Sequence, residues 1–254
     1  MNNDGSQGWD DYAPFYDWEN AQTLARRDVP FWQRLAAAQT GLILELGCGT
    51  GRLTLPVART GARIVGIDRS TPMLARARQR LRRARVAALL LRGDIRQLPF
   101  RRRTRFDLVM APYGMLQSLT TDRDLRLTLD AVGTVLRRGG LFAIDLVPDL
   151  PRWAEYDRRV SLAGRRGRGQ VRLTESVRQD RAKGLTIFDQ EYEERRGGRR
   201  LSKHFSLTFR TISVAAMRRR LERAGFEIDA VLGDYDGGPF DARADVWIIL
   251  ARKR

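Results

Sequence analysis

Between residues 41 and 148, short apolar runs alternate with stretches that carry apolar side chains at helical spacing. Five runs predict strands, at residues 42–46, 62–67, 86–91, 106–111 and 141–147. The intervening stretches predict helices, at residues 53–59, 71–81 and 121–136. Because the strands are continuously apolar and are separated by helices, we expect a parallel sheet that is covered on both faces.

The pattern changes after Pro151. Apolar and polar residues then alternate, which predicts three antiparallel strands, at residues 171–181, 184–195 and 200–210. A predicted helix at 214–224 and two predicted strands at 226–232 and 245–251 complete the chain. The predicted fold class is α/β, with a doubly wound, Rossmann-like core built on a mixed seven-stranded sheet. An antiparallel β insertion is expected to cover the active site.

Three regions follow from this pattern. Residues 1–40 are expected to form an N-terminal helical cap rich in aromatic side chains. Residues 41–151 and 212–254 are expected to form the core that binds a cofactor. Residues 152–211 form the insertion, which we expect to act as a substrate lid or as an oligomer contact.

The loop after the first predicted strand reads Glu-Leu-Gly-Cys-Gly-Thr-Gly over residues 45–51. Glycines let the backbone turn tightly and approach a ligand, and the start of the next helix presents free amide groups. Asp68 ends the second strand, where a carboxylate can accept hydrogen bonds from ribose hydroxyls. The dinucleotide fingerprint, Gly-x-Gly-x-x-Gly, would place its third glycine at position 52. This chain has arginine there, so the spacing disfavours NAD.

This segment resembles motif I of the class I S-adenosylmethionine-dependent methyltransferases. Further features match that family in order: Asp68, residues 93–95, the strand at 106–110 and the turn at 138–140. The resemblance covers residues 12–148 well and residues 213–253 moderately. It implies S-adenosylmethionine as cofactor and S-adenosylhomocysteine as product.

The resemblance also implies which residues contact the cofactor. Gly47 and Gly49 would approach the methionine portion and the ribose, Asp68 would hold the ribose hydroxyls, and Asp94 would accept from the adenine amino group. Met73 would press on the adenine face, although a core role suits it nearly as well. The expected cofactor-binding set is Tyr16, Glu45, Gly47, Cys48, Gly49, Asp68, Arg69, Met73, Gly93, Asp94, Ile95, Ala111, Tyr113 and Met115.

Three regions are candidates for contact with the methyl acceptor: the N-terminal aromatic residues, the insertion, and the glycine-rich loop at 233–241. The candidate catalytic residues are His204, Tyr113 and Tyr235. His204 is the one histidine, and histidine titrates near neutrality without perturbation, so it is the candidate general base. A base is needed only if the nucleophile arrives protonated, because the cofactor supplies the electrophile.

The positive net charge of the chain is compatible with a second function, the methylation of a polymer. The chain carries 47 Lys and Arg residues against 30 Asp and Glu residues, a formal net charge of +17. All the basic residues except Lys183, Lys203 and Lys253 are arginine, which coding bias explains better than selection for phosphate binding. The alternative is methylation of RNA or protein through the basic surface. Pro112 and Tyr113 match part of the Asn/Asp-Pro-Pro-Tyr motif of enzymes that methylate base amines. Ala111, however, stands where that motif has its Asn or Asp.

The remaining composition narrows the class of protein. A single cysteine and a single histidine exclude an internal disulfide and a structural zinc site, and we expect no metal. The longest apolar runs fall far short of the ~20 residues that cross a bilayer. We therefore expect a cytoplasmic monomer or homodimer, without membrane partners, that methylates an N or O atom of a small molecule.

Overall fold

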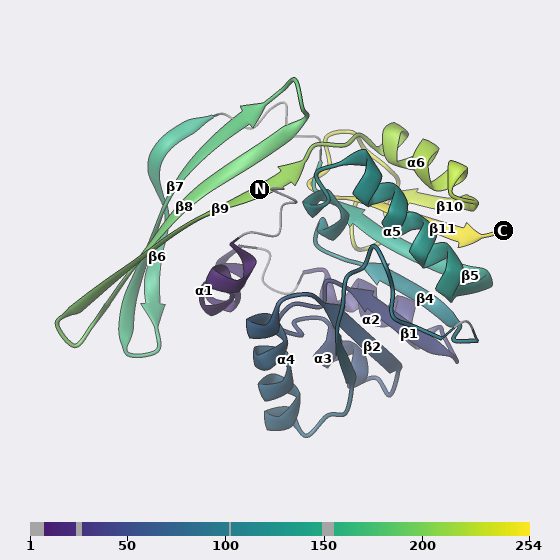
Figure 1. The fold of residues 1–254 in the computed structure, drawn as a ribbon, viewed down its shortest axis with the longest axis horizontal. Helices are drawn as coiled ribbons and strands as arrows, with labels where there is room; N and C mark the ends of the chain where they lie inside the picture. The colour runs from purple at the N-terminus through teal and green to yellow at the C-terminus, as the bar shows by residue number, and fades with distance from the viewer. Residues whose placement is uncertain (1–7, 24–26, 102, 149–154) are drawn as a thin grey trace.

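The computed structural model describes residues 8–23, 27–101, 103–148 and 155–254. These residues form two sheets that stand side by side, with the N-terminal helix between them (Figure 1). The predicted boundary between core and insertion, at 151/152, lies outside the described residues.

The larger sheet has seven strands in the order β10-β11-β5-β4-β1-β2-β3. Neighbouring strands from β5 to β3 pair in parallel, whereas β11 is antiparallel to both β5 and β10. The strands are β1 (Leu42–Leu46), β2 (Arg63–Asp68), β3 (Leu89–Arg92), β4 (Phe106–Ala111), β5 (Leu136–Leu146), β10 (Phe226–Leu232) and β11 (Trp247–Lys253). The predicted mixed seven-stranded, Rossmann-like fold is therefore confirmed.

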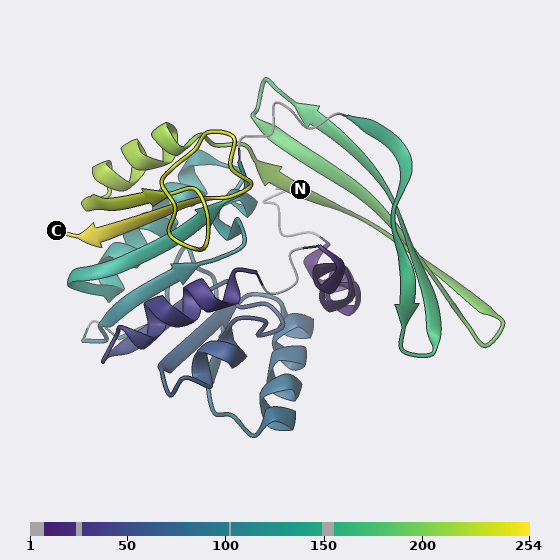
Figure 2. The same cartoon turned by 180° about the vertical axis from the view of Figure 1, so that it is seen from behind.

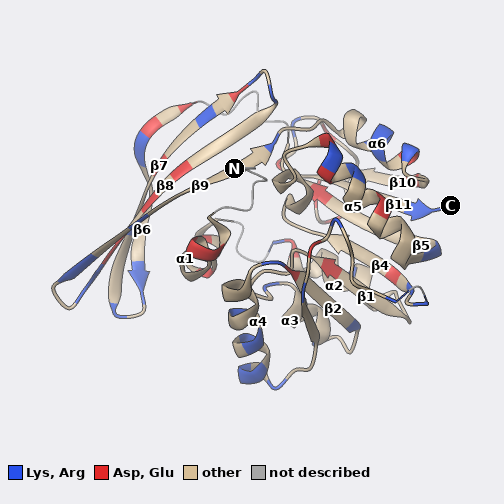
Figure 3. Cartoon of the chain, in the orientation of Figure 1, with Lys and Arg blue, Asp and Glu red and all other residues tan. Residues whose placement is uncertain are grey.

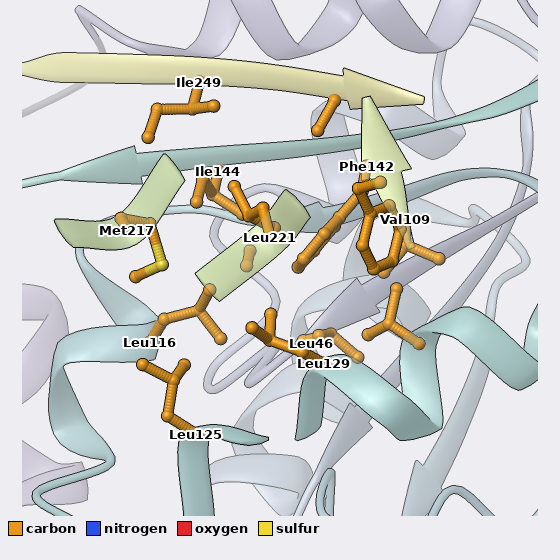
Figure 4. Packing of buried hydrophobic residues seen from close by; sticks show 14 of the residues in the cluster. Leu46, Val109, Leu116, Leu125, Leu129, Phe142, Ile144, Met217, Leu221 and Ile249 are labelled. Carbon is orange, nitrogen blue, oxygen red and sulfur yellow. The ribbon is translucent and has the colours of Figure 1, made fainter. Parts of the chain in front are cut away.

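Helices cover both faces of this sheet. Leu129 of α5 and Leu221 of α6 pack with Phe142 on one face (Figure 4), and Trp32 of α2 packs with Leu108 on the other. The helices are α2 (Val29–Ala37), α3 (Thr54–Ala58), α4 (Thr71–Ala84), α5 (Asp122–Val135) and α6 (Val214–Arg223), with a short 3₁₀ helix, η1 (Met115–Ser118). Continuous burial on both faces explains why the strands read as unbroken apolar runs.

The insertion is a separate antiparallel sheet in the order β6-β7-β8-β9. Its strands are β6 (Tyr156–Arg166), β7 (Gly169–Asp180), β8 (Leu185–Arg196) and β9 (Arg199–Arg210). The alternating pattern predicted the last three. It missed β6 because this edge strand is exposed along most of its length and has no apolar alternation.

Two core strands also begin at different residues than predicted. β3 begins at Leu89 rather than at residue 86. β5 begins at Leu136, because the predicted turn at 138–140 continues the strand across an irregularity in its pairing with β4. Gly139 has φ +69° there, a conformation that glycine adopts without a steric penalty.

Helix α1 (Trp9–Gln22) lies between the insertion and the core (Figure 2). Its Tyr12 and Phe15 pack in one cluster with Leu173 and Tyr192 of the insertion and with Met73 of α4. The N-terminal segment thus joins the two sheets through apolar and aromatic contacts. None of the helices among the described residues has the length and apolarity needed to cross a membrane.

Candidate active site

A cavity of about 510 Å³ lies between the core and the insertion. Its core side is formed by the segments that follow β1, β2, β3 and β4, the edge at which open α/β sheets bind ligands. Its other side is formed by α1 and by one face of the insertion. Its described lining residues are Trp9, Tyr12, Tyr16, Glu19, Thr23, Gly47, Gly49, Asp68, Arg69, Met73, Gly93, Asp94, Ile95, Arg96, Pro112, Tyr113, Gly114, Met115, Gln117, Ser118, Leu119, Val147, Ser161, Leu162, Leu173, Glu175, Phe188, Gln190, Leu207 and Phe209.

The glycine loop takes a backbone shape that only glycine adopts readily. Gly47, Gly49 and Gly51 have φ values of +62°, +52° and +72°. A Cβ at Gly47 would lie 2.6 Å from Cγ of Met115, so no side chain fits there. At Gly49 the nearest atom to such a Cβ is 3.9 Å away, so the backbone borders open space. The loop therefore leaves room for a ligand against its backbone.

Asp68 is fixed by the same loop. Its Oδ2 accepts from the Gly49 amide at 2.8 Å and its Oδ1 accepts from the Ser70 amide at 2.8 Å. Burial raises the pKa of this carboxyl, and the backbone hydrogen bonds partly oppose that shift. Each carboxylate oxygen can accept more than one hydrogen bond, so Asp68 can still receive the two hydroxyls of a ribose.

Asp94 has a partner that the sequence did not reveal. Its carboxylate accepts from Nε of Arg96 at 3.0 Å and from Nη2 at 2.6 Å, and the Arg96 guanidinium lowers its pKa. Arg96 also donates to Asp124 of α5 at 2.9 Å. The two carboxylates balance the positive charge of Arg96 at the adenine end of the expected site.

A strained turn follows β4. Tyr113 and Gly114 have φ values of +62° and +61°, and both line the cavity. Buried Asp145 holds this turn, because its Oδ1 accepts from the Gly114 amide at 2.7 Å and its Oδ2 accepts from the Tyr235 hydroxyl at 2.7 Å. Burial raises the pKa of Asp145 to about 6. Tyr235 is not among the described residues that line the cavity, and its hydroxyl is linked to the turn through Asp145.

This arrangement makes Tyr235 a positioning residue, and we expect Tyr235→Phe to lower kcat with little change in cofactor affinity. The variant leaves one oxygen of buried Asp145 without its donor, which costs about 1–3 kcal/mol where that contact is needed. Steady-state kinetics give kcat and KM separately, and calorimetry with S-adenosylhomocysteine gives the cofactor affinity. A kcat equal to that of the wild type would show that the Tyr235–Asp145 contact does not position the turn. Exposed Phe240, in the same loop, gives the control variant Phe240→Ala.

A buried ion pair contacts Tyr16 of α1. Arg52 donates to both oxygens of fully buried Asp28, at 2.7 and 2.6 Å. Its guanidinium lies 5.4 Å from the centre of the Tyr113 ring and is hydrogen-bonded to Tyr16. Burial raises the pKa of Tyr16, so this phenol stays protonated near neutrality. Tyr16 is therefore fixed at the edge of the cavity.

The structure brings most of the predicted cofactor residues together. Those that line the cavity are Tyr16, Gly47, Gly49, Asp68, Arg69, Met73, Gly93, Asp94, Ile95, Tyr113 and Met115. Three do not line it. Glu45 is buried and accepts from Thr54 at 2.6 Å, Cys48 is buried with its pKa raised by burial, and Ala111 is fully buried in β4.

His204 lies away from the cavity. Strand β9 points alternate residues to opposite faces, and Leu207 and Phe209 face the cavity whereas His204 faces solvent. Its Nε2 is 3.2 Å from the Ser202 hydroxyl and 3.5 Å from Glu191, and 66% of its side chain is exposed. This position does not suit the general base that the sequence suggested.

Sequence reasoning missed several residues that line the cavity. Glu19, Glu175 and Gln190 are polar side chains on the α1 and insertion side, and Gln117 joins η1 to the ends of β5 and β9 through hydrogen bonds. Glu175 lies between Leu173 and Val177 on the apolar face of β7. A charged residue in that apolar row was the sequence feature that could have indicated this site. Within the described ranges, no group of three or more His, Cys, Asp or Glu residues could hold a metal ion.

Comparisons with known proteins agree with this geometry. A family model described as "Methyltransferase domain" matches residues 43–140, which contain the glycine loop, Asp68 and Asp94. The chain is 24% identical to a putative methyltransferase, YqeM, of Bacillus subtilis over 95% of this chain and 92% of that protein. It is 27% identical to the cypemycin N-terminal methyltransferase of a Streptomyces species, over 83% of each.

Solved structures share the fold across nearly the whole chain. The CcbJ methyltransferase from Streptomyces caelestis superposes with a TM-score of 0.81 at 20% identity, covering 98% of this chain and 99% of that one. A sugar N-methyltransferase from Streptoalloteichus superposes with a TM-score of 0.75 at 17% identity, covering 94% and 93%. Together with the motif and the cavity, the match over residues 43–140 identifies a class I S-adenosylmethionine-dependent methyltransferase domain, with S-adenosylmethionine as methyl donor.

Proposed function

We propose that this enzyme transfers a methyl group to an N or O atom of a small molecule that binds between the glycine loop and the insertion. The observation that carries the proposal is the cavity itself. Its volume of about 510 Å³ lies within the ~300–1,000 Å³ of small-molecule sites, and α1 and the insertion cover its side opposite the core. One structural neighbour is named a sugar N-methyltransferase, and one sequence relative is named the cypemycin N-terminal methyltransferase.

The core half of the cavity supplies the proposed cofactor site. The glycine loop leaves space against Gly49, Asp68 can accept ribose hydroxyls, and Met73 and Ile95 offer apolar surface for adenine. Tyr16 of α1 and Tyr113 of the turn after β4 also line the cavity. When bound, the cofactor supplies an electrophilic methyl group on a sulfonium.

The insertion half supplies the proposed acceptor site, and residues 152–211 act as its lid. Leu162, Leu173 and Phe188 offer apolar surface from three strands, and Ser161 and Gln190 offer polar groups. These side chains exclude water and hold the acceptor atom in line with the methyl group. Such alignment can contribute ~7–11 kcal/mol without a catalytic base.

Filling the acceptor half tests the proposal. We expect Leu162→Trp to lower methyl transfer on the order of 100-fold, because a larger side chain displaces the acceptor from in-line geometry. S-adenosylhomocysteine affinity should stay unchanged. Leu201→Trp is the matched control, since Leu201 is 55% exposed and lies outside the cavity lining. Equal turnover of Leu162→Trp and the wild type would place the acceptor elsewhere.

A polymer acceptor is the alternative, and arginines at the hairpin ends favour it. The β6–β7 and β8–β9 hairpins carry blue tips in Figure 3. The exposed arginines there are Arg165, Arg168, Arg195, Arg196, Arg199 and Arg200. If they are a solvated face, RNA should bind weakly at physiological salt. Sub-micromolar RNA affinity that falls when Arg165 and Arg168 are neutralised would instead support the polymer alternative.

A further inference from the structure

The acceptor half of the cavity contains two carboxylates, and we propose that they bind a cationic amine, which makes this enzyme an N-methyltransferase of amine-bearing small molecules. This inference rests on the proposed small-molecule function and specifies its substrate class. Glu175 lies on β7 and is only 8% exposed, and Glu19 lies on α1 across the cavity.

Among the described residues, both carboxylates accept hydrogen bonds from neutral donors alone. Glu19 accepts from the hydroxyls of Tyr12, at 2.8 Å, and Tyr192. Glu175 accepts from the Tyr156 hydroxyl and, at 2.7 Å, from the Gln190 amide. Burial raises the pKa of Glu19, and the nearby charge of Glu175 raises it further. Buried carboxylates normally have a cationic partner, because desolvation of an unpaired charge is costly.

The described lining of the acceptor half contains no basic side chain, although the chain as a whole is strongly basic. Of its 254 residues, 47 are Lys or Arg. The cavity-lining residues that the structure describes on α1 and the insertion include no Lys, Arg or His. The basic residues that line the cavity, Arg69 and Arg96, both belong to the core side. The positive charge missing from the acceptor half is therefore the charge a ligand would bring.

Gln190 gives an independent indication of the same polarity. It is 5% exposed and sits directly opposite Glu175 in the β7–β8 pairing. Its Nε2 donates to Glu175, which fixes the amide orientation, and its Oε1 has no hydrogen-bond partner within the described structure. The unpartnered Gln190 oxygen on the cavity wall is thus an acceptor, and it requires a ligand that donates a hydrogen bond.

The aromatic side chains complete a site for an amine with an apolar body. Trp9, Tyr12 and Tyr16 line the cavity from α1, and Phe188 and Phe209 line it from the insertion. Aromatic faces attract ammonium groups and also pack against hydrocarbon. A neutral alcohol would use the acceptors but would leave two carboxylates uncompensated.

The reaction balances with these residues, the amine and the methyl donor. The bound ammonium first gives one proton to a carboxylate, for which Glu19 is placed, and this frees the nitrogen lone pair. The nitrogen then forms a bond to the methyl carbon while the carbon–sulfur bond breaks, with its electron pair moving to sulfur. The product nitrogen carries the positive charge again, which the Glu175 carboxylate stabilises until release, and Glu19 then gives its proton to solvent.

The test uses the full-length enzyme with a varied set of primary and secondary amines, each paired with the alcohol of the same skeleton. We expect methylation of amines in preference to their alcohols. Glu175→Gln should raise the amine KM by about 10- to 150-fold, since a hydrogen bond to a charged group is lost, while S-adenosylhomocysteine affinity stays the same. Glu191→Gln is the matched control, because Glu191 lies on the solvent face of β8 beside His204.

The outcomes separate this inference from the proposed function. A preference for alcohols, or an unchanged amine KM in Glu175→Gln, would overturn the amine assignment and leave the small-molecule function standing. Methylation of RNA or protein with no small molecule accepted would overturn both. A melting-temperature measurement guards against misfolding: Glu175→Gln removes a buried charge and should melt no lower than the wild type, whereas amines should raise the melting temperature of the wild type more than that of the variant.

Discussion

Replacing Asp28 by Ala is expected to lower the free energy of unfolding by about 3–5 kcal/mol, because it leaves the guanidinium of Arg52 buried without its anionic partner. Asp28 is fully buried, and 10% of the Arg52 side chain is exposed. Arginine cannot escape this cost by losing its proton. Urea denaturation of the variant and the wild type measures the difference.

An exposed pair provides the control for this change. Asp130 and Arg126 form an ion pair on α5 at 3.1 Å, with side chains 51% and 65% exposed. Asp130→Ala should change stability by no more than about 1 kcal/mol. The double variant Asp28→Leu, Arg52→Met should recover much of the loss, because it buries no charge. A single Asp28→Ala variant as stable as Asp130→Ala would contradict this reading of the pair.

The second large effect concerns cofactor affinity. Asp68→Ala should weaken S-adenosylhomocysteine binding by about 1.5–3 kcal/mol, since the variant loses charge-assisted hydrogen bonds to the ribose. It also removes the acceptor of the Gly49 amide, which holds the glycine loop. Titration calorimetry measures the affinity, and Asp229→Ala, on the edge strand β10, is the control.

NAD gives a second arm to the same experiment. Arg52 stands where the dinucleotide fingerprint has its third glycine, so NAD should show no measurable binding to the wild type. Binding of NAD as tight as that of S-adenosylhomocysteine, or an Asp68→Ala variant with unchanged affinity, would contradict the cofactor site described above.

The sequence predicted the core well because its signals are local. Strand β1, the glycine loop and Asp68 lie within a short segment, and periodicity is enough to order the strands that follow. Strand β6 was missed because an exposed edge strand carries no apolar alternation. The start of β5 was misplaced because glycines that usually mark a turn can also continue an irregular strand.

The acceptor half was harder to predict because it depends on contacts across the fold. Glu19 and Glu175 are 156 residues apart in sequence (175 − 19) and meet only when α1 packs against the insertion. His204 was chosen for its chemistry, but the alternation of β9 turns it to solvent. Tyr235 was predicted to reach the substrate, yet it contacts Asp145 instead. A single sequence does not fix which face a strand turns toward a distant element.

A crystal structure with bound S-adenosylhomocysteine tests whether the cavity is divided into a cofactor half and an acceptor half. We expect ribose hydroxyls at Asp68, adenine between Met73 and Ile95, and the sulfur turned toward Glu175 and Gln190. A complex with adenosine against the insertion, or with the sulfur directed away from Glu175, would contradict it.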